Sequence, residues 1–149
     1  MKNVISLVST IYTKLAAWDA LPLLLIRLSI GSIFIQTGLG KLMHFGGTVN
    51  FFASLGIPYP VINAAAASSI EFFGGILVIA GLLTRPAAAK LAFVMVIAIL
   101  TAHLAEIETL SDLIRVQAFD YLLFFVLLLF TGAGKLSIDH WIKTRFFSK

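Results

Sequence analysis

Four long apolar segments constrain this chain more than any other feature of its sequence. Each is close to the roughly 20 residues that a helix needs to cross a hydrocarbon core of about 30 Å. The connections between them are too short to hold a separate soluble domain, so residues 21–149 are predicted to form one membrane domain. The segments are about Leu21–Met43, Val61–Leu83, Ala87–Ile107 and Ala118–Leu136.

Composition also indicates a membrane protein, and a helical one. Hydrophobic residues make up 60% of the 149 residues and charged residues only 12%, with a mean hydropathy of +1.02. The segments are continuously apolar with interspersed glycine and alanine, whereas a transmembrane barrel needs short strands that alternate in polarity. The predicted fold is therefore an all-α membrane protein, a four-transmembrane-helix bundle in a lipid bilayer.

The distribution of Lys and Arg predicts how the bundle is oriented. Most of the basic residues fall on one side of the predicted topology, and by the positive-inside rule that side, with both termini, is cytoplasmic. This distribution explains the net charge of +4 without nucleic acid as a partner. The cytoplasmic set is Lys2, Lys14, Arg85, Lys90, Lys135, Lys143, Arg145 and Lys149, against Lys41 and Arg115 on the other side.

Residues 1–20 are predicted to form a cytoplasmic amphipathic segment. Ile5, Val8, Tyr12 and Leu15 recur at helical spacing, and Lys14 can reach anionic headgroups. Tyr12 and Lys14 interrupt the apolar run that a cleaved signal peptide requires. We therefore expect a retained interfacial helix.

Two nearly identical stretches, TGLGKL at 37–42 and TGAGKL at 131–136, raise the question of a phosphate-binding loop. Such a loop needs Gly-x4-Gly-Lys-Ser/Thr between a strand and a helix, and neither copy has that spacing or context. Both are expected to close an apolar helix, where glycine accommodates the turn and lysine approaches unpaired carbonyls or the interface. Lys41 is the more informative lysine because it opposes the positive-inside trend.

Arg27 and Glu71 lie inside predicted spans, where an ionised group is costly unless it is paired. Arg27, Gly31, Phe34, Gly38 and Lys41 share one face of the first helix. On the second helix the matching stripe is Ala64, Ser68, Glu71, Gly75 and Leu82, whose small residues predict a close approach of another helix around Glu71. An outer-half polar cluster follows, composed of Gln36, Lys41, Glu71, His103, Glu106 and Asp120.

Three interpretations of this cluster stay open. In the first, Arg27 or Lys41 neutralises Glu71 and fixes the register of the helices. In the second, acid, base and imidazole line a cavity for a polar headgroup such as a quinone ring and handle its protons, or form a proton pathway. A metal site of His44, His103 and Glu106 is the third, although the Glu-x-x-His motif of carboxylate-bridged centres is missing.

Cysteine is absent from the chain. This excludes disulfides, dithiol redox chemistry and thiolate-ligated clusters within it. Electron transfer would therefore need a bound cofactor or a partner protein.

Several short motifs follow one another in a distinctive order after about residue 20. In order and spacing they resemble the DoxX family of small four-helix membrane proteins. The motifs are Arg27 with Gly31, Gly38-x-Gly40-Lys41, Gly56-Ile57-Pro58, Glu71-x-x-Gly74-Gly75, Gly81-Leu82-Leu83-Thr84-Arg85, His103 and Gly132-x-Gly134-Lys135-Leu136-Ser137-x-Asp139.

This resemblance implies a function, because the family includes subunits of quinone-linked thiosulfate oxidoreductases and of terminal oxidase systems. The leading hypothesis is a bacterial inner-membrane accessory subunit that binds quinone or a quinone-like compound in the Arg27/Glu71/His103 region and couples to a redox partner protein. Arg27 and Lys41 would orient ligand oxygens, and Glu71 or His103 would exchange protons. Gln36 and Asp120 complete the predicted ligand-binding set.

The main rival hypothesis is a non-enzymatic scaffold, assembly factor or small-solute transporter, in which Arg27 and Glu71 form a structural ion pair. A stand-alone enzyme is least favoured, since the chain carries no recognised cofactor motif or soluble catalytic domain. Faces of small residues also allow the chain to form a homo-oligomer.

Overall fold

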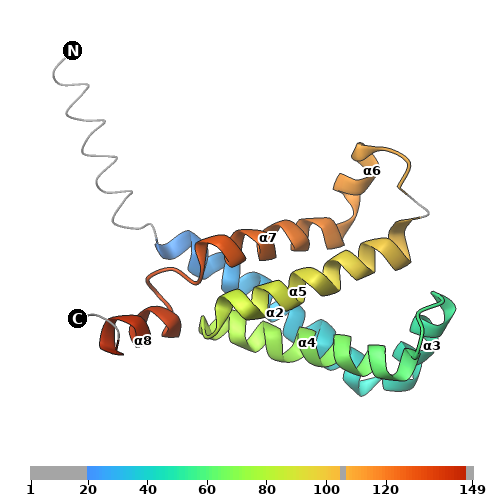
Figure 1. Ribbon diagram of the computed structural model, residues 1–149, viewed down its shortest axis with the longest axis horizontal. Helices are drawn as coiled ribbons and strands as arrows, with labels where there is room; N and C mark the ends of the chain where they lie inside the picture. The colour runs from blue at the N-terminus through green and yellow to red at the C-terminus, as the bar shows by residue number, and fades with distance from the viewer. Residues whose placement is uncertain (1–19, 105–106, 147–149) are drawn as a thin grey trace, which may run out of the picture.

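The computed structural model describes residues 20–104 and 107–146, and this part of the chain is helical and contains no β-strand. Figure 1 shows long helices that run back and forth between two ends of the molecule. In chain order the elements are α2 (Ala20–Met43), α3 (Phe45–Ser54), α4 (Pro60–Ala80), α5 (Thr84–Ala98), the π-helix η1 (Ile99–His103), α6 (Leu110–Arg115), α7 (Gln117–Thr131) and α8 (Ile138–Phe146).

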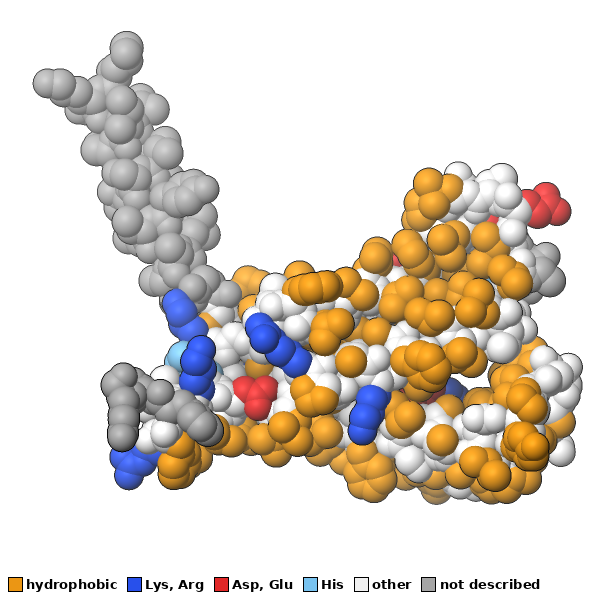
Figure 2. Space-filling view, in the orientation of Figure 1, with side chains coloured by type: hydrophobic (Ala, Val, Ile, Leu, Met, Phe, Trp, Pro, Cys, Tyr) orange, Lys and Arg blue, Asp and Glu red, His pale blue; other side chains and the backbone are white. Residues whose placement is uncertain are grey.

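The two ends of the bundle are distinct. The short helices α3 and α6 lie at one end, here named the α3 end, and α8 lies with the first residues of α2 at the other, the α8 end (Figure 1). Lys and Arg side chains gather mainly toward the α8 end in the face shown by Figure 2. The two ends differ in charge as the sequence predicts, while the cytoplasmic position of the termini stays a prediction.

Three helices in the described part of the chain are long and apolar enough to cross a membrane: Ala20–Met43, Pro60–Ala80 and Thr84–His103. The fourth predicted segment forms α7, an apolar helix of 15 residues. It ends at Thr131 rather than Leu136 because Gly132 turns the chain with a φ of 76°. The membrane-helix prediction is thus confirmed for three segments, and the predicted interfacial helix at 1–20 falls almost wholly outside the described residues.

The two Gly-x-Gly-Lys stretches differ in structure. The second closes α7 as predicted, with Gly132 at the C-cap. The first also lies at the end of its helix, since α2 ends at Met43 with Lys41 in its last turn. The role predicted for its glycines is wrong, however, because both Gly38 and Gly40 lie inside the helix. Gly38 serves packing instead: a Cβ there would collide with the backbone of Phe72 on α4.

Helices α2 and α4 pack closely along their small residues. A Cβ built on Gly75 would lie 2.8 Å from the carbonyl oxygen of Gly31 and 2.9 Å from the amide nitrogen of Ile35. Such distances leave no room for a side chain, so the backbones approach as small-residue interfaces in membranes do. The predicted close approach of another helix around Glu71 is confirmed.

A hydrophobic core joins this pair to α5 and α7. Leu91 of α5 and Phe125 and Leu128 of α7 are fully buried. Phe34 of α2 meets Tyr121 and Phe125 edge to face, with ring centroids 5.2 Å and 4.8 Å apart. This geometry is the favourable one for aromatic pairs, and it fixes α7 against α2.

Helices α3 and α6 occupy stretches that the sequence assigned to loops. The Thr48 hydroxyl donates to the carbonyl oxygens of Lys41 and His44, at 3.1 Å and 3.3 Å, and so ties α3 to the end of α2. Helix α6 begins with a capping box of Thr109 and Asp112. The hydrogen bonds from Thr109 hold the pKa of Asp112 below its usual range, so this cap is ionised at neutral pH.

Candidate functional site at the α3 end

A cavity of about 460 Å³ lies at the α3 end, between α4, the α5 to η1 helix, and α3 with the turn that follows it. Figure 2 shows the surface hollowed at this end. The walls are mainly apolar, with Phe52, Ile57, Ala67 and Ile97 among them. A cavity of this size and lining is typical of sites that hold a small organic ring.

Lys41 of α2 and Glu71 of α4 contribute the charged groups of the cavity. The Lys41 Nζ donates to Oε1 of Glu71 at 2.5 Å. The Glu71 side chain is 2% exposed and that of Lys41 is 37% exposed. The second carboxylate oxygen, Oε2, is buried and has no hydrogen-bond partner among the described residues. The carboxylate is therefore only half satisfied.

The packing of α2 on α4 explains why Lys41 reaches Glu71. Helical side chains lean toward the N-terminus of their own helix, so Lys41 extends back from the last turn of α2 toward the middle of α4. Gly38 lies one turn earlier and brings the two backbones together at Phe72, next to Glu71. A bulky residue at Gly38 would hold the two charged groups apart.

The structure divides the polar cluster that the sequence predicts. Lys41 and Glu71 come together, whereas Gln36 of α2 and Asp120 of α7 are exposed and are not among the described residues that line the cavity. His103 is half-buried at the end of η1, directly after the lining residue Ala102, but does not itself line the cavity. The ligand roles of Gln36, Asp120 and His103 stay predictions.

Arg27 lies at the α8 end, away from Glu71, and the expected pairing of these two residues does not form. Its side chain is 1% exposed and donates four hydrogen bonds to backbone carbonyl oxygens. Nε donates to Val78 at 2.9 Å and Nη2 to Ile79 at 2.8 Å, in the last turn of α4. Nη1 donates to Ala133 at 2.7 Å and to Leu136 at 2.8 Å, in the loop before α8.

This arrangement satisfies carbonyls that a helix end leaves unpaired, and it places a cation where the helix dipole is negative. Gly81, with a φ of 65°, closes α4 beside the guanidinium, and any Cβ there would collide with Arg27. Arg27 thus binds the end of α4 and the loop after α7 together. Its predicted contact with a ligand has no support in this geometry, because the hydrogen bonds hold it within the backbone.

Sequence reasoning missed the role of Asp139, which completes this α8-end network. Its carboxylate accepts from the backbone N–H groups of Leu83 at 2.8 Å and Thr84 at 2.9 Å, and so caps α5. Its own N–H donates to the carbonyl of Gly81 at 2.8 Å. The motif Ser137-x-Asp139 was visible in the sequence, but nothing there tells which helix it caps.

Asn63 is a second residue that sequence reasoning missed, on the wall of the cavity. Its Nδ2 donates to the carbonyl of Pro58 at 2.6 Å and holds the turn between α3 and α4. A signal for it existed, since Asn63, Ala67 and Glu71 follow at steps of four on one helix face. The proposed metal group of His44, His103 and Glu106 is not tested, because Glu106 lies outside the described residues.

Comparisons with known proteins agree with the resemblance seen in the sequence. The family model named DoxX matches residues 22–104, which include Arg27, Lys41 and Glu71. The chain is 36% identical to "Putative oxidoreductase CatD" of Bacillus subtilis over 80% of this chain and 85% of that protein. It is 33% identical to "Inner membrane protein YphA" of Escherichia coli over 86% and 95% of the two chains. No solved structure gives a significant match.

Proposed function

The chain belongs to the DoxX family of membrane proteins, and on that premise we propose that it is a subunit that binds a quinone-type headgroup in the α3-end cavity. The proposal includes a redox partner protein that exchanges electrons with the bound quinone. The name of the Bacillus subtilis relative, "Putative oxidoreductase CatD", supports the redox assignment.

One observation carries the proposal: Glu71 is buried, lines the cavity, and leaves Oε2 without a partner. An unsatisfied buried acceptor is costly, by roughly 1–3 kcal/mol and more for a charged group. A ligand that places an O–H group in the cavity beside Glu71 would remove that cost. The position of the carboxylate therefore selects for a ligand with a hydrogen-bond donor in at least one of its states.

A quinone headgroup fits this pair of charged groups. Lys41 has three N–H donors, one of which is directed to Glu71, and the others can serve a ring oxygen. In the reduced ligand the ring hydroxyl becomes a donor, and Oε2 of Glu71 is the acceptor available to it. Bound quinone would supply two-electron, two-proton redox chemistry, while the chain itself supplies orientation and a proton acceptor.

Lys41 has a further part in this proposal. Its ammonium pairs with Oε1 of the buried Glu71 carboxylate, which leaves Oε2 as the acceptor available to the ligand. The partial exposure of Lys41 also leaves a path from the cavity to solvent at the α3 end. Phe52 of α3 and Ile97 of α5 line the cavity and offer apolar surface to the ring.

A second candidate function is a non-enzymatic membrane scaffold, favoured by the place of the ion pair. Lys41 and Glu71 join α2 to α4 next to the close contact of Gly38 with Phe72. A purely structural pair would fix the register of the two helices there. The two candidates differ in what Glu71→Gln does, because this change keeps the shape of the side chain but removes its charge.

The experiment is mass analysis of small molecules retained by the protein purified in native lipid, for the wild type, Glu71→Gln and a control, Glu108→Gln. Glu108 is an exposed carboxylate outside the cavity and outside the predicted ligand-binding set, so its change tests for unspecific loss. We expect near-stoichiometric quinone in the wild type and the control, and at least about tenfold less in Glu71→Gln, equivalent to about 1.4 kcal/mol.

Thermal unfolding of the same three samples separates the two candidates. A similar Tm for all three, with ligand lost only from Glu71→Gln, supports the quinone site. Absence of retained quinone in the wild type, together with a clearly lower Tm for Glu71→Gln alone, would contradict it and favour the structural pair.

A further inference from the structure

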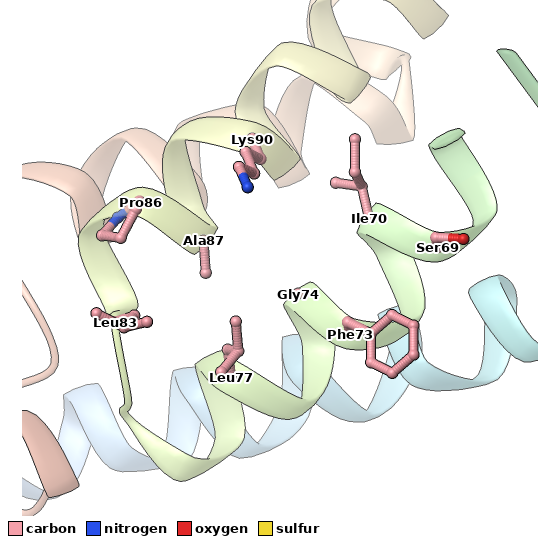
Figure 3. A pocket seen from close by; sticks show the side chains of 9 residues that line it. All are labelled: Ser69, Ile70, Phe73, Gly74, Leu77, Leu83, Pro86, Ala87 and Lys90. Atoms are coloured by element: carbon pink, nitrogen blue, oxygen red, sulfur yellow. The ribbon is translucent and has the colours of Figure 1, made fainter. Parts of the chain in front are cut away.

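A second cavity of about 280 Å³ lies between α4 and the first half of α5, on the α8 side of the candidate site. Figure 3 shows the side chains that line it, with Leu77 and Gly74 on α4 facing Ala87 and Lys90 on α5 and Leu83 just before α5. Its walls are apolar apart from Ser69 and Lys90. Nothing in the function proposed above uses this cavity.

The two cavities belong to one seam. Ile70 lines both of them. On α4 the lining residues continue from one cavity to the other at steps of three and four, through Ala67, Ile70, Gly74 and Leu77. Residues at these steps share one face of a helix, so the seam follows a single stripe of α4.

The lining residues on α5 also continue from one cavity to the other. Ala87 and Lys90 line the second cavity, and Val94, Ile97 and Thr101 line the first. From Glu71 to Leu77 the rise along α4 is about 9 Å, at about 1.5 Å per residue. A chain of several methylene groups therefore reaches from the charged pair into the second cavity.

The seam opens on the side of the bundle that would meet hydrocarbon. Phe73 of α4 and Phe93 of α5, which line the second and first cavity, are 60% and 65% exposed. Both belong to helices long and apolar enough to cross a membrane. A molecule dissolved in the bilayer can thus reach the seam sideways, without passing through water.

We propose that the α4/α5 seam holds the hydrophobic tail of the ligand, so that the site selects a long-tailed, membrane-dissolved quinone rather than a small water-soluble one. This inference rests on the proposed function and specifies its ligand class. The headgroup lies beside Lys41 and Glu71, and the tail passes Ile70 into the second cavity. Lys90 lines the second cavity with its aliphatic stem, while its ammonium can extend toward the interface at the α8 end.

The test uses a quinone with a decyl tail that carries a photoactivatable diazirine at its end, added to the full-length protein in lipid nanodiscs. After irradiation, mass spectrometry locates the labelled residues. We expect labelling around Leu77 and Leu83, and we expect an excess of the same quinone headgroup without a tail to compete it away. Glu71→Gln should lose this labelling together with headgroup binding.

Matched variants test the path of the tail. Ser69→Phe narrows only the second cavity, so it should lose the labelling at Leu77 while the tailless headgroup still binds. Ile70→Phe fills the junction of the two cavities and should lose the labelling as well. Ile76→Phe adds the same bulk at a half-exposed position of α4 outside both cavities and should label like the wild type. Ser69→Phe keeps the test valid if Ile70→Phe fails to fold.

The outcomes distinguish this inference from the proposed function. Headgroup binding with tail labels elsewhere on the bundle would overturn the seam and leave the site intact. Labelling at Leu77 that the tailless headgroup does not compete away would show that the seam takes up the tail as it would any lipid chain, without the headgroup in its site. This result would also overturn the inference. Absence of headgroup binding to the wild type would overturn the proposed function itself.

Discussion

Two buried charged side chains at similar exposure, Arg27 at the α8 end and Glu71 at the α3 end, have opposite surroundings. Arg27 directs its guanidinium to four backbone carbonyls, and close-packed backbone surrounds it. Glu71 has one partner, Lys41, and an unpaired oxygen beside a cavity. Burial of a charge is therefore not enough to indicate a ligand site. An incompletely satisfied charge next to a cavity is the better candidate.

The difference has a physical origin in what each end must satisfy. The last turn of α4 leaves carbonyls without intrahelical donors, and Arg27 supplies planar donors in a fixed fork that matches several of them. At the α3 end Glu71 pairs with Lys41 through Oε1, while Oε2 has no hydrogen-bond partner among the described residues. We therefore assign a structural role to Arg27 and propose the α3 end as the ligand site.

Arg27→Gln is the change that should have the largest effect on stability. It removes the charge and most of the donors that serve four backbone carbonyls, and hydrogen bonds to charged groups are worth roughly 1.5–3 kcal/mol each. We expect loss of several kcal/mol, seen as low yield of folded protein and a much lower Tm in detergent. Arg27→Lys should recover only part of it, because an ammonium lacks the planar fork.

The structural role of Arg27 would be contradicted if Arg27→Gln folds with a normal Tm and loses bound quinone. That result would return Arg27 to the ligand-binding set predicted from the sequence. Quinone content should be measured per folded molecule, so that reduced yield is not mistaken for reduced binding.

A smaller effect is expected from alanine at Gly38, compared with alanine at Gly40 in the same TGLGKL stretch. A Cβ at Gly38 collides with the Phe72 backbone, whereas one at Gly40 meets nothing within 4 Å. Overpacking should cost Gly38→Ala roughly 1–3 kcal/mol and weaken quinone binding by separating Lys41 from Glu71. Gly40→Ala should keep or raise the Tm, since alanine favours helix by up to about 1 kcal/mol. Equal Tm values would show that α2 and α4 are not as close as described.

The smallest effect is expected from Asp139→Ala. The change removes the carboxylate that caps α5 at Leu83 and Thr84, and the loss of such a cap typically costs about 0.5–2 kcal/mol. Quinone binding should stay unchanged, because Asp139 belongs to the α8 end. Chemical unfolding with a ligand-binding assay checks both parts. Reduced binding at full stability would show that the two ends are coupled.

Much of the fold could be predicted from the sequence. The apolar segments predicted three of the observed long helices to within a few residues, and the small-residue stripes predicted which faces of α2 and α4 are buried. Helix α3 was missed because its glycine-containing sequence resembles a loop. Helix α7 was predicted too long, because the predicted segment runs past Gly132. The helix ends there because Gly132 has a positive φ, and the carbonyl of the next residue, Ala133, accepts a hydrogen bond from Arg27.

The candidate site could be predicted only in part. Lys41 and Glu71 were named, together with Arg27, Gln36, His103 and Asp120 as further members. The spacing of residues on one helix determines the face they occupy, but not their direction around a neighbouring helix. Gln36 and Asp120 lie at suitable positions along their helices, but both residues are exposed.

The amino-acid sequence is enough to identify a helical membrane protein of the DoxX family with charges inside its spans. Which partner each charge has depends on how the helices pack. Glu71 pairs with Lys41 because the contact of Gly38 with Phe72 sets the register of α2 on α4. Arg27 instead binds a loop more than 100 residues later in the chain. Such pairings depend on distances between elements remote in sequence, which helical periodicity does not encode.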